Sequence, residues 1–225
     1  AFKRGDDLHT MLASRITGKS PDKVTKDERQ AGKSANFGLL YGMGAYGFRA
    51  YAEDVYGVSF TLDEAQKIHR AFFEVWDGMA QWHLAMATRV RQTGQVVSPI
   101  GRVRRLPAAL GSSDDRVAAA ERAAINSPVQ GFASDLMQIA AASIEGMLPG
   151  VPGVDGARIV ATVHDSIVIE VLHTDWHDVT EACMRRMISV PEVLWNMGCH
   201  FDVPLAVEAK VGTRWGLADV GELSA

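Results

Sequence analysis

The sequence predicts an α+β fold in which helices precede most of the β structure. Over residues 48–55 and 61–96, apolar residues recur every three or four positions, which is the spacing of amphipathic helices. Residues 95–107 and 158–171 each hold two short β-rich runs around a turn, the pattern of an antiparallel hairpin. The chain of 225 residues is long enough for one large domain or two small ones.

The composition is that of an ordinary globular protein, with 47% hydrophobic and 22% charged residues. The formal net charge of −4 does not mark the chain as a strongly basic nucleic-acid binder. No apolar run reaches the roughly 20 residues that span a bilayer, so no membrane partner is expected. Cys183 and Cys199 have no metal-ligand or redox spacing, and we expect buried free thiols in a reducing cytoplasm.

Turn and cap signals define the first elements. Asp6 or Asp7 lies near the start of a helix that runs to about Arg15, where the helix dipole favours acidic side chains. Judged from the residues alone, His9 in this helix has a structural or solvated role. Pro21 suits the first position of a short second helix.

The most informative stretch is the helix predicted over residues 29–42. Arg29, Lys33, Phe37 and Tyr41 recur every four residues and therefore lie along one slowly drifting stripe. The two cations suit phosphate groups, and the two rings suit a sugar or a base. An ordinary amphipathic helix, with core aromatics and solvated cations, is the alternative.

Two features favour the ligand-binding interpretation of this helix. The polar Asn36 interrupts its apolar run. Glycines crowd its C-terminal end, where they permit left-handed backbone or the close approach of a ligand. These are Gly38, Gly42, Gly44 and Gly47.

Helical spacing continues over residues 48–55 and 61–96, and the second of these segments starts at a capping box between Thr61 and Glu64. Its stripe of Met and aromatic residues is interpreted as core. The hairpin of residues 95–107 then carries a basic cluster on its second arm. The cluster, Arg102, Arg104 and Arg105, suits duplex phosphates or is simply solvated.

The C-terminal half begins with a loop at residues 111–115. Helices are expected over residues 116–125 and 129–147, with a break around Pro128, and a Gly/Pro loop over residues 150–156. The hairpin of residues 158–171 should present a polar trio at its tip, namely His164, Asp165 and Ser166. A helix over residues 175–197 and a strand over residues 203–211 complete the chain.

Several of these segments resemble family A DNA polymerases. The pattern Arg-x3-Lys-x3-Phe-Gly-x2-Tyr-Gly is similar to the family's fingers helix. The resemblance implies that Arg29 and Lys33 bind nucleotide phosphates and act in catalysis. It also implies that Phe37 lies against the sugar and Tyr41 near the templating base. The segment Gly-x-Asp-x-His-Thr is similar to the family segment whose histidine, His9 in this chain, contacts the triphosphate.

The later segments carry further roles by the same resemblance. Residues 121–131 resemble the segment that follows the primer terminus and the minor groove, where Asn and Gln can donate to acceptors present on every base pair. Judged from the residues alone, Asn126 and Gln130 could instead be caps or turn formers. The primer and template contacts implied are Tyr41, Arg102, Arg104, Arg105, Arg122, Asn126, Gln130 and His164.

The hairpin of residues 158–171 is similar to the palm hairpin that carries one of two catalytic aspartates. Asp165 is therefore expected to be catalytic and to bind metal. Ser166 stands where the commonest family pattern has a glutamate, a position regarded as secondary, and activity is still expected. The resemblance further implies two Mg²⁺ ions, with the second ligand strand absent from this chain.

The implied architecture is the helical fingers and part of the antiparallel-sheet palm of a right-hand polymerase. Residues 1–28 would lead from palm to fingers, residues 29–93 would form the fingers, and residues 94–225 the palm with the basic hairpin, the primer-contacting helices and the catalytic hairpin. The implied function is the C-terminal catalytic part of a template-directed DNA polymerase, which adds deoxynucleotides to a primer 3′ end.

The expected partners are primer-template DNA, dNTPs and a separate N-terminal chain or domain that carries the other catalytic aspartate. The expected location is the bacterial cytosol, or the host cytosol if the source is viral. A non-catalytic fragment that binds nucleotide or primer-template is the main alternative. An α-rich scaffold unrelated to DNA is a third interpretation, and would make the helix stripe, the Asn126/Gln130 pair and the Asp165 hairpin three coincidences.

Overall fold

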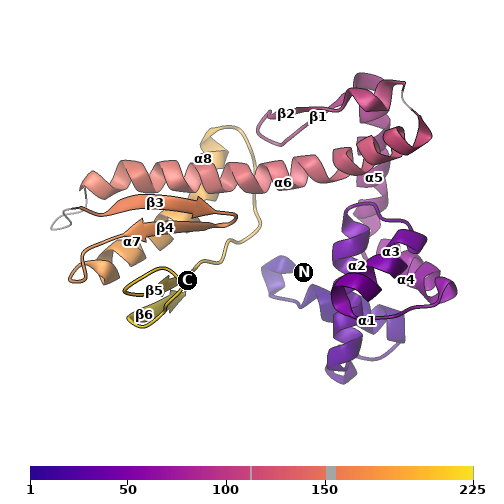
Figure 1. Cartoon of the computed structure of the whole chain (residues 1–225), viewed down its shortest axis with the longest axis horizontal. Coiled ribbons are helices and arrows are strands. Elements are labelled where there is room, and N and C mark those ends of the chain that lie inside the picture. Colours follow the sequence, from indigo (N-terminus) through magenta and orange to yellow (C-terminus); the bar gives the residue numbers. More distant parts are fainter. Residues whose placement is uncertain (112, 151–155, 225) are drawn as a thin grey trace. The chain divides into compact units, whose positions relative to one another are not determined.

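The computed structural model describes residues 1–111, 113–150 and 156–224. The chain divides into two compact units, Ala1–Val129 and Gln130–Ala225. Helices dominate the first unit, and the second combines helices with antiparallel hairpins (Figure 1). This combination confirms the predicted α+β class.

The first unit is built from helices and one short hairpin. The helices are α1 (Leu8–Thr17), α2 (Lys26–Leu40), α3 (Ala45–Tyr56), α4 (Leu62–Val75), α5 (Asp77–Thr93) and the first part of α6 (Asp114–Met147). The hairpin pairs β1 (Gln95–Val97) with β2 (Val103–Arg105), as predicted. Short 3-10 helices lie at Phe2–Arg4, Pro21–Lys23 and Pro107–Leu110. The core of α1 to α4 contains Leu12, Ala35, Leu39, Phe48, Ala52, Ala65, Ile68 and Phe72.

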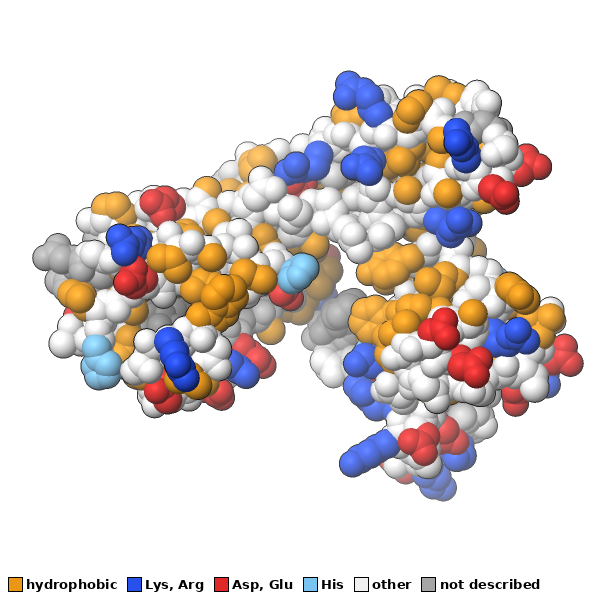
Figure 2. Space-filling model, viewed as in Figure 1, with side chains coloured by type: hydrophobic (Ala, Val, Ile, Leu, Met, Phe, Trp, Pro, Cys, Tyr) orange, Lys and Arg blue, Asp and Glu red, His pale blue; other side chains and the backbone are white. Residues whose placement is uncertain are grey.

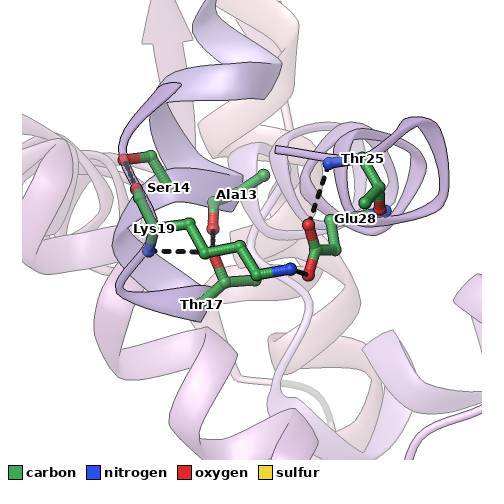
Figure 3. A network of polar contacts seen from close by, with 6 residues as sticks. All are labelled: Ala13, Ser14, Thr17, Lys19, Thr25 and Glu28. Atoms are coloured by element: carbon green, nitrogen blue, oxygen red, sulfur yellow. Dashed lines mark hydrogen bonds and ion pairs between the residues drawn. The ribbon is translucent and has the colours of Figure 1, made fainter. Parts of the chain in front are cut away.

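A network of polar contacts joins the end of α1 to the start of α2 (Figure 3). Gly18 ends α1 in the left-handed conformation, with φ of 71°. Ser14 Oγ donates to the Lys19 carbonyl at 2.6 Å, and Lys19 Nζ lies 2.5 Å from Glu28 Oε1. Glu28 also forms a capping box with Thr25, which starts α2. These contacts thus hold the end of α1 and the start of α2 together.

Gly32 lets α1 and α2 approach closely. A Cβ atom at this position would lie 2.4 Å from the carbonyl oxygen of His9 and 3.1 Å from the Cβ of Ala13. Only a residue without a side chain fits there. The close approach places His9 beside the face of α2 that carries the predicted nucleotide-binding stripe.

The segment of residues 61–96 is two helices and a strand instead of one long helix. Its start is as predicted, since Thr61 and Glu64 form the capping box of α4. The helix stops at Trp76, whose φ of −116° and ψ of 67° lie outside the helical region. Asp77 then begins α5, where an acid suits the N-terminus, and the poor helix former Gly78 follows.

The prediction of two helices broken around Pro128 is wrong, because α6 continues through this residue. Proline cannot donate to the carbonyl of Ala124, so the helix loses one hydrogen bond. Trp82 Nε1 donates to the Ile125 carbonyl at 3.2 Å in the turn that proline disturbs, and Ala124 is fully buried. Tertiary packing therefore outweighs the tendency of Pro128 to break the helix.

The second unit begins within α6 and adds two hairpins and two helices. Its further elements are the 3-10 helix Leu148–Gly150, β3 (Arg158–Val163), β4 (Ser166–Glu170), α7 (Trp176–Ile188), α8 (Val190–Asn196), β5 (Glu208–Val211) and β6 (Gly221–Ser224). Antiparallel pairs form between β3 and β4 and between β5 and β6. The core contains Ile144, Leu148, Val179 and Cys183.

Several predicted boundaries in the second unit need correction. The expected helix of residues 175–197 is α7 and α8, separated at Ser189, because Pro191 suits the first turn of a new helix. The expected strand of residues 203–211 is only β5, and β6 was not predicted. Ser166 belongs to β4 and not to the turn. The predicted loops at residues 111–115 and 150–156 lie in part outside the described residues.

Both cysteines are free thiols. Cys183 is buried as predicted, and burial raises the pKa of its thiol to about 11. Cys199 is only half-buried. Within the described ranges, no helix has the length and apolar character that crossing a membrane requires.

Candidate functional site

The predicted stripe lies on one side of α2 and at its C-terminal end. Arg29, Lys33 and Phe37 are in the helix, and Tyr41 is its C-cap residue. The side chain of Arg29 is 44% exposed and Phe37 is 38% exposed. Lys33 makes no hydrogen bond or ion pair with any residue that the structure describes. Both cations can therefore reach an anionic ligand.

Arg29 is held by an acidic residue that also caps α1. Its Nε donates to Asp7 Oδ2 at 2.6 Å. Asp7 further accepts the backbone N–H groups of His9 and Thr10, at 3.0 and 3.3 Å, and the Thr10 hydroxyl at 2.9 Å. The Arg29 guanidinium and these other donors hold the pKa of the Asp7 carboxyl well below its usual range. In this structure, Asp7 is therefore the counter-ion of Arg29.

His9 reaches the stripe from α1. Its ring centroid lies 5.7 Å from that of Phe37. Burial lowers the pKa of the His9 imidazole, and the positive charges of Arg29 and Lys33 lower it further, whereas Asp7 acts in the opposite direction. The imidazole is therefore neutral at pH 7.

Asn36 connects His9 to a tryptophan between α4 and α5. The Asn36 Nδ2 atom lies 3.1 Å from His9 Nδ1 and donates to the Leu8 carbonyl at 3.1 Å. Trp76 Nε1 donates to Asn36 Oδ1 at 2.9 Å. Three elements thus meet at one half-buried amide.

The C-terminal end of α2 packs against α6 of the same unit. Gly42 has φ of 81°, and a Cβ atom there would lie 2.9 Å from Ile125 Cδ1. His83 Nε2 lies 3.0 Å from the carbonyl of Leu40. Tyr41 is half-buried between these contacts along the chain. The glycine is needed both for its conformation and for the close approach.

The predicted basic cluster lies on the β1–β2 hairpin. Arg102 precedes β2, and Arg104 and Arg105 are in it. All three are exposed, and Figure 2 shows Lys and Arg side chains over this end of the first unit. Arg104 pairs with Val96, and Arg105 pairs with Gln95. Neighbouring residues of a strand point to opposite faces, so the cluster is not a single-faced patch.

The other predicted DNA contacts lie on α6. Arg122 and Asn126 are one turn apart, and Arg122 is exposed. The Oδ1 atom of Asn126 is buried and has no hydrogen-bond partner within the described ranges. Gln130 is exposed further along the same helix, where the second unit begins. An unpaired buried oxygen is unusual in a folded protein.

Asp165 lies in the two-residue turn between β3 and β4, after His164. Val163 and Ser166 pair across this turn, and Ser166 Oγ donates to the Val163 carbonyl at 2.8 Å. His164 has φ of 55°, which is rare for a residue with a side chain. His164 and Asp165 are both exposed.

The described residues do not complete a metal site. No three His, Cys, Asp or Glu side chains within residues 1–111, 113–150 and 156–224 form a group that could hold a metal ion. A hard divalent cation takes about six or more oxygen ligands, some of which can be water. The exposed carboxylate of Asp165 can supply one of them.

The structure brings some predicted residues together and separates others. His9 joins the α2 stripe, whereas the arginine cluster, the α6 residues and Asp165 lie on other elements. Sequence reasoning missed the pairing of Asp7 with Arg29, the need for Gly32, and the bond from Trp76 to Asn36. Asn36 gave a signal as a polar residue in an apolar run. Trp76 gave none, because its partner is 40 positions away.

Comparisons with known proteins agree with these observations. The sequence profile described as DNA polymerase family A matches residues 1–217. The chain is 33% identical over 215 residues to DNA polymerase I of Aquifex aeolicus (strain VF5), covering 96% of this chain and 34% of that protein. It is also 33% identical to DNA polymerase I of Mycobacterium tuberculosis (strain ATCC 25618 / H37Rv), covering 97% of this chain and 22% of that protein.

A solved structure is also similar. It is the POL domain of Pol1 from M. smegmatis in complex with DNA primer-template and dNTP, with a TM-score of 0.73 and 29% sequence identity. The match covers 84% of this chain and 32% of that chain. The chain thus spans between about a fifth and a third of the length of these relatives. On the match of the family profile to residues 1–217, the chain belongs to DNA polymerase family A.

Proposed function

We propose that this chain is a nucleotide-binding and catalytic part of an enzyme that adds deoxynucleotides to a primer 3′ end under the direction of a DNA template. The observation that carries the proposal is the face of α2, where two available cations precede two aromatic residues and His9 joins from α1. The family membership and the relatives named DNA polymerase I support it. So does the similar structure, whose complex contains primer-template and dNTP.

The α2 stripe would hold the incoming dNTP along its length. Arg29 and Lys33 bind the phosphates and stabilise the negative charge that develops as the leaving group departs. His9 donates a further hydrogen bond to a phosphate oxygen. The exposed ring of Phe37 packs against the sugar, and Tyr41 lies near the templating base. Arg29 exchanges the Asp7 carboxylate for a phosphate when the nucleotide arrives.

Primer-template DNA would be held by residues outside the stripe. Arg102, Arg104 and Arg105 neutralise backbone phosphates. Arg122, Asn126 and Gln130 follow the primer terminus, where the amides contact the minor-groove edge of each base pair without selecting a sequence. His164 contacts the primer beside Asp165. Residues 1–28 connect palm and fingers, residues 29–93 form the fingers, and residues 94–225 belong to the palm.

Asp165 would provide one carboxylate ligand for the Mg²⁺ ions that this class of reaction uses. When bound, such ions activate the attacking hydroxyl and stabilise the leaving group. Within residues 1–111, 113–150 and 156–224, no further His, Cys, Asp or Glu side chains gather with Asp165 into a group that could hold a metal ion. As family membership suggests, a separate N-terminal chain or domain would carry the second catalytic aspartate.

The stripe is tested by measuring the dissociation constant of a dNTP for Lys33→Ala and for Lys67→Ala. Lys67 is exposed on α4, so its replacement makes the same change of charge away from the stripe. Because a hydrogen bond to a charged group contributes about 1.5–3 kcal/mol, Lys33→Ala should bind dNTP at least about tenfold more weakly. Equal effects of the two substitutions would contradict the proposal.

A further inference from the structure

We infer that Asn36 and Trp76 are positioning residues that fix the orientation and tautomer of His9, so that His9 presents its Nε2–H toward the triphosphate. The inference rests on the proposed function for the identity of the ligand. Its geometric part concerns only α1, α2 and the junction of α4 and α5, all of which lie in the first unit.

The first step is the orientation of the Asn36 amide. An indole N–H can only donate a hydrogen bond, so the atom of Asn36 that lies 2.9 Å from Trp76 Nε1 is its oxygen. The amide nitrogen then lies on the opposite side. There it donates to the Leu8 carbonyl at 3.1 Å, which is an acceptor only. Both neighbours thus require the same orientation of the amide.

The second step is the tautomer of His9. The amide nitrogen of Asn36 lies 3.1 Å from His9 Nδ1, and an amide nitrogen cannot accept a hydrogen bond. His9 Nδ1 must therefore be the acceptor, and the proton of the neutral ring is on Nε2. Protonation of Nδ1 would place two donors against each other.

The third step is the charge of the ring. His9 is surrounded by Asp7, Arg29 and Lys33, and its pKa is lowered by burial and by the two cations. A neutral ring with its proton on Nε2 offers a donor to a phosphate oxygen without placing a third positive charge beside Arg29 and Lys33. The donor is ready before the nucleotide arrives, which reduces the cost of ordering it.

The break between α4 and α5 places Trp76 for this contact. Trp76 ends α4 and begins α5, with backbone angles outside the helical region. Its backbone N–H still bonds to the Phe72 carbonyl at 2.9 Å, and its own carbonyl accepts the N–H of Met79 at 2.9 Å. The main chain is therefore held on both sides of the break, and the indole is half-buried against α2.

The test compares Trp76→Phe and Asn36→Leu with Trp82→Phe. Trp76→Phe keeps an aromatic ring and removes the N–H. Trp82 is a matched control, because its Nε1 also makes one hydrogen bond in the same unit, to the Ile125 carbonyl, without a link to His9. Nitrogen NMR of the His9 ring in the folded chain should show the Nε2–H tautomer in the native protein and in Trp82→Phe. Trp76→Phe and Asn36→Leu should show a mixture of tautomers.

A second measurement separates positioning from a general structural effect. Trp76→Phe and Asn36→Leu should weaken dGTP binding about three- to tenfold in the native background and have no further effect when combined with His9→Ala. An Nδ1–H tautomer in the native protein, or equal losses with and without His9, would overturn the inference. The NMR measurement needs no nucleotide, so a native chain that binds no dGTP would refute the proposed function separately.

Discussion

At the scale of single residues, Asp7 has two roles, capping α1 and pairing with Arg29, which different substitutions can separate. Its carboxylate accepts backbone N–H groups at the start of α1 and pairs with Arg29 of α2. The Asp7 side chain is 41% exposed, so the ion pair is of the kind that contributes about 0.2–1 kcal/mol. A phosphate group can therefore replace Asp7 at Arg29 with little loss.

We predict that Asp7→Asn binds dNTP up to about fivefold more tightly, because Arg29 is released while asparagine still caps the helix. Asp7→Ala also loses the cap and should lower the free energy of unfolding by about 1 kcal/mol. Calorimetric dNTP titration and urea unfolding of both variants measure the two effects. Weaker binding by Asp7→Asn would mean that Asp7 orients Arg29 for the nucleotide instead of competing with it.

Phe37 determines a second prediction at the residue scale. Its ring has no hydroxyl that could replace the missing 3′ hydroxyl of a dideoxynucleotide. The native protein should therefore discriminate against dideoxynucleotides, and Phe37→Tyr should accept them markedly better. Incorporation ratios for a matched dNTP and ddNTP measure this selectivity. An unchanged ratio in Phe37→Tyr would show that the ring does not contact the sugar.

At the scale of the elements, the contact of α1 with α2 depends on Gly32. Gly32→Ala would force the His9 carbonyl away from a new Cβ atom and should lower the free energy of unfolding by about 1–3 kcal/mol. Gly47→Ala is the matched control in α3, because a Cβ atom there meets nothing within 4 Å, and it should raise stability by about 0.5–1 kcal/mol. Urea unfolding measures both. A stabilising Gly32→Ala would contradict the close approach.

The β3–β4 hairpin gives a prediction that separates stability from DNA binding. His164 has a positive φ that glycine adopts without strain, so His164→Gly should keep or raise the melting temperature. His173 is also exposed and does not share this conformation, so His173→Gly should be slightly destabilising. If the imidazole contacts the primer, His164→Gly should still weaken primer-template binding. A lower melting temperature for His164→Gly than for His173→Gly would contradict the stability prediction.

The elements also show what the sequence could and could not reveal. The capping box at Thr61 and the strand–turn–strand pattern around Asp165 are local signals, and both predictions are confirmed. The continuous helix through Pro128 depends on tertiary contacts that no short window contains. The stripe on α2 was readable because four residues share one helical period. The residues that position the stripe come from other helices, and the sequence did not reveal these contacts.

At the scale of the whole molecule, the chain has its proposed nucleotide-binding stripe in the unit Ala1–Val129 and its candidate catalytic carboxylate, Asp165, in the unit Gln130–Ala225. The central claim is that both serve one reaction. A protein that binds dNTP and primer-template without extending the primer would agree with the binding role of the stripe. It would contradict the catalytic role of Asp165.

The most direct test is primer extension with Mg²⁺ on the native preparation, including any chain that co-purifies with this one of 24.4 kDa. Asp165→Asn is compared with Asp178→Asn, which makes the same change of charge at an exposed position of α7. Extension should be lost in Asp165→Asn and kept in Asp178→Asn, with primer-template binding retained in both. Undiminished extension by Asp165→Asn would contradict the account.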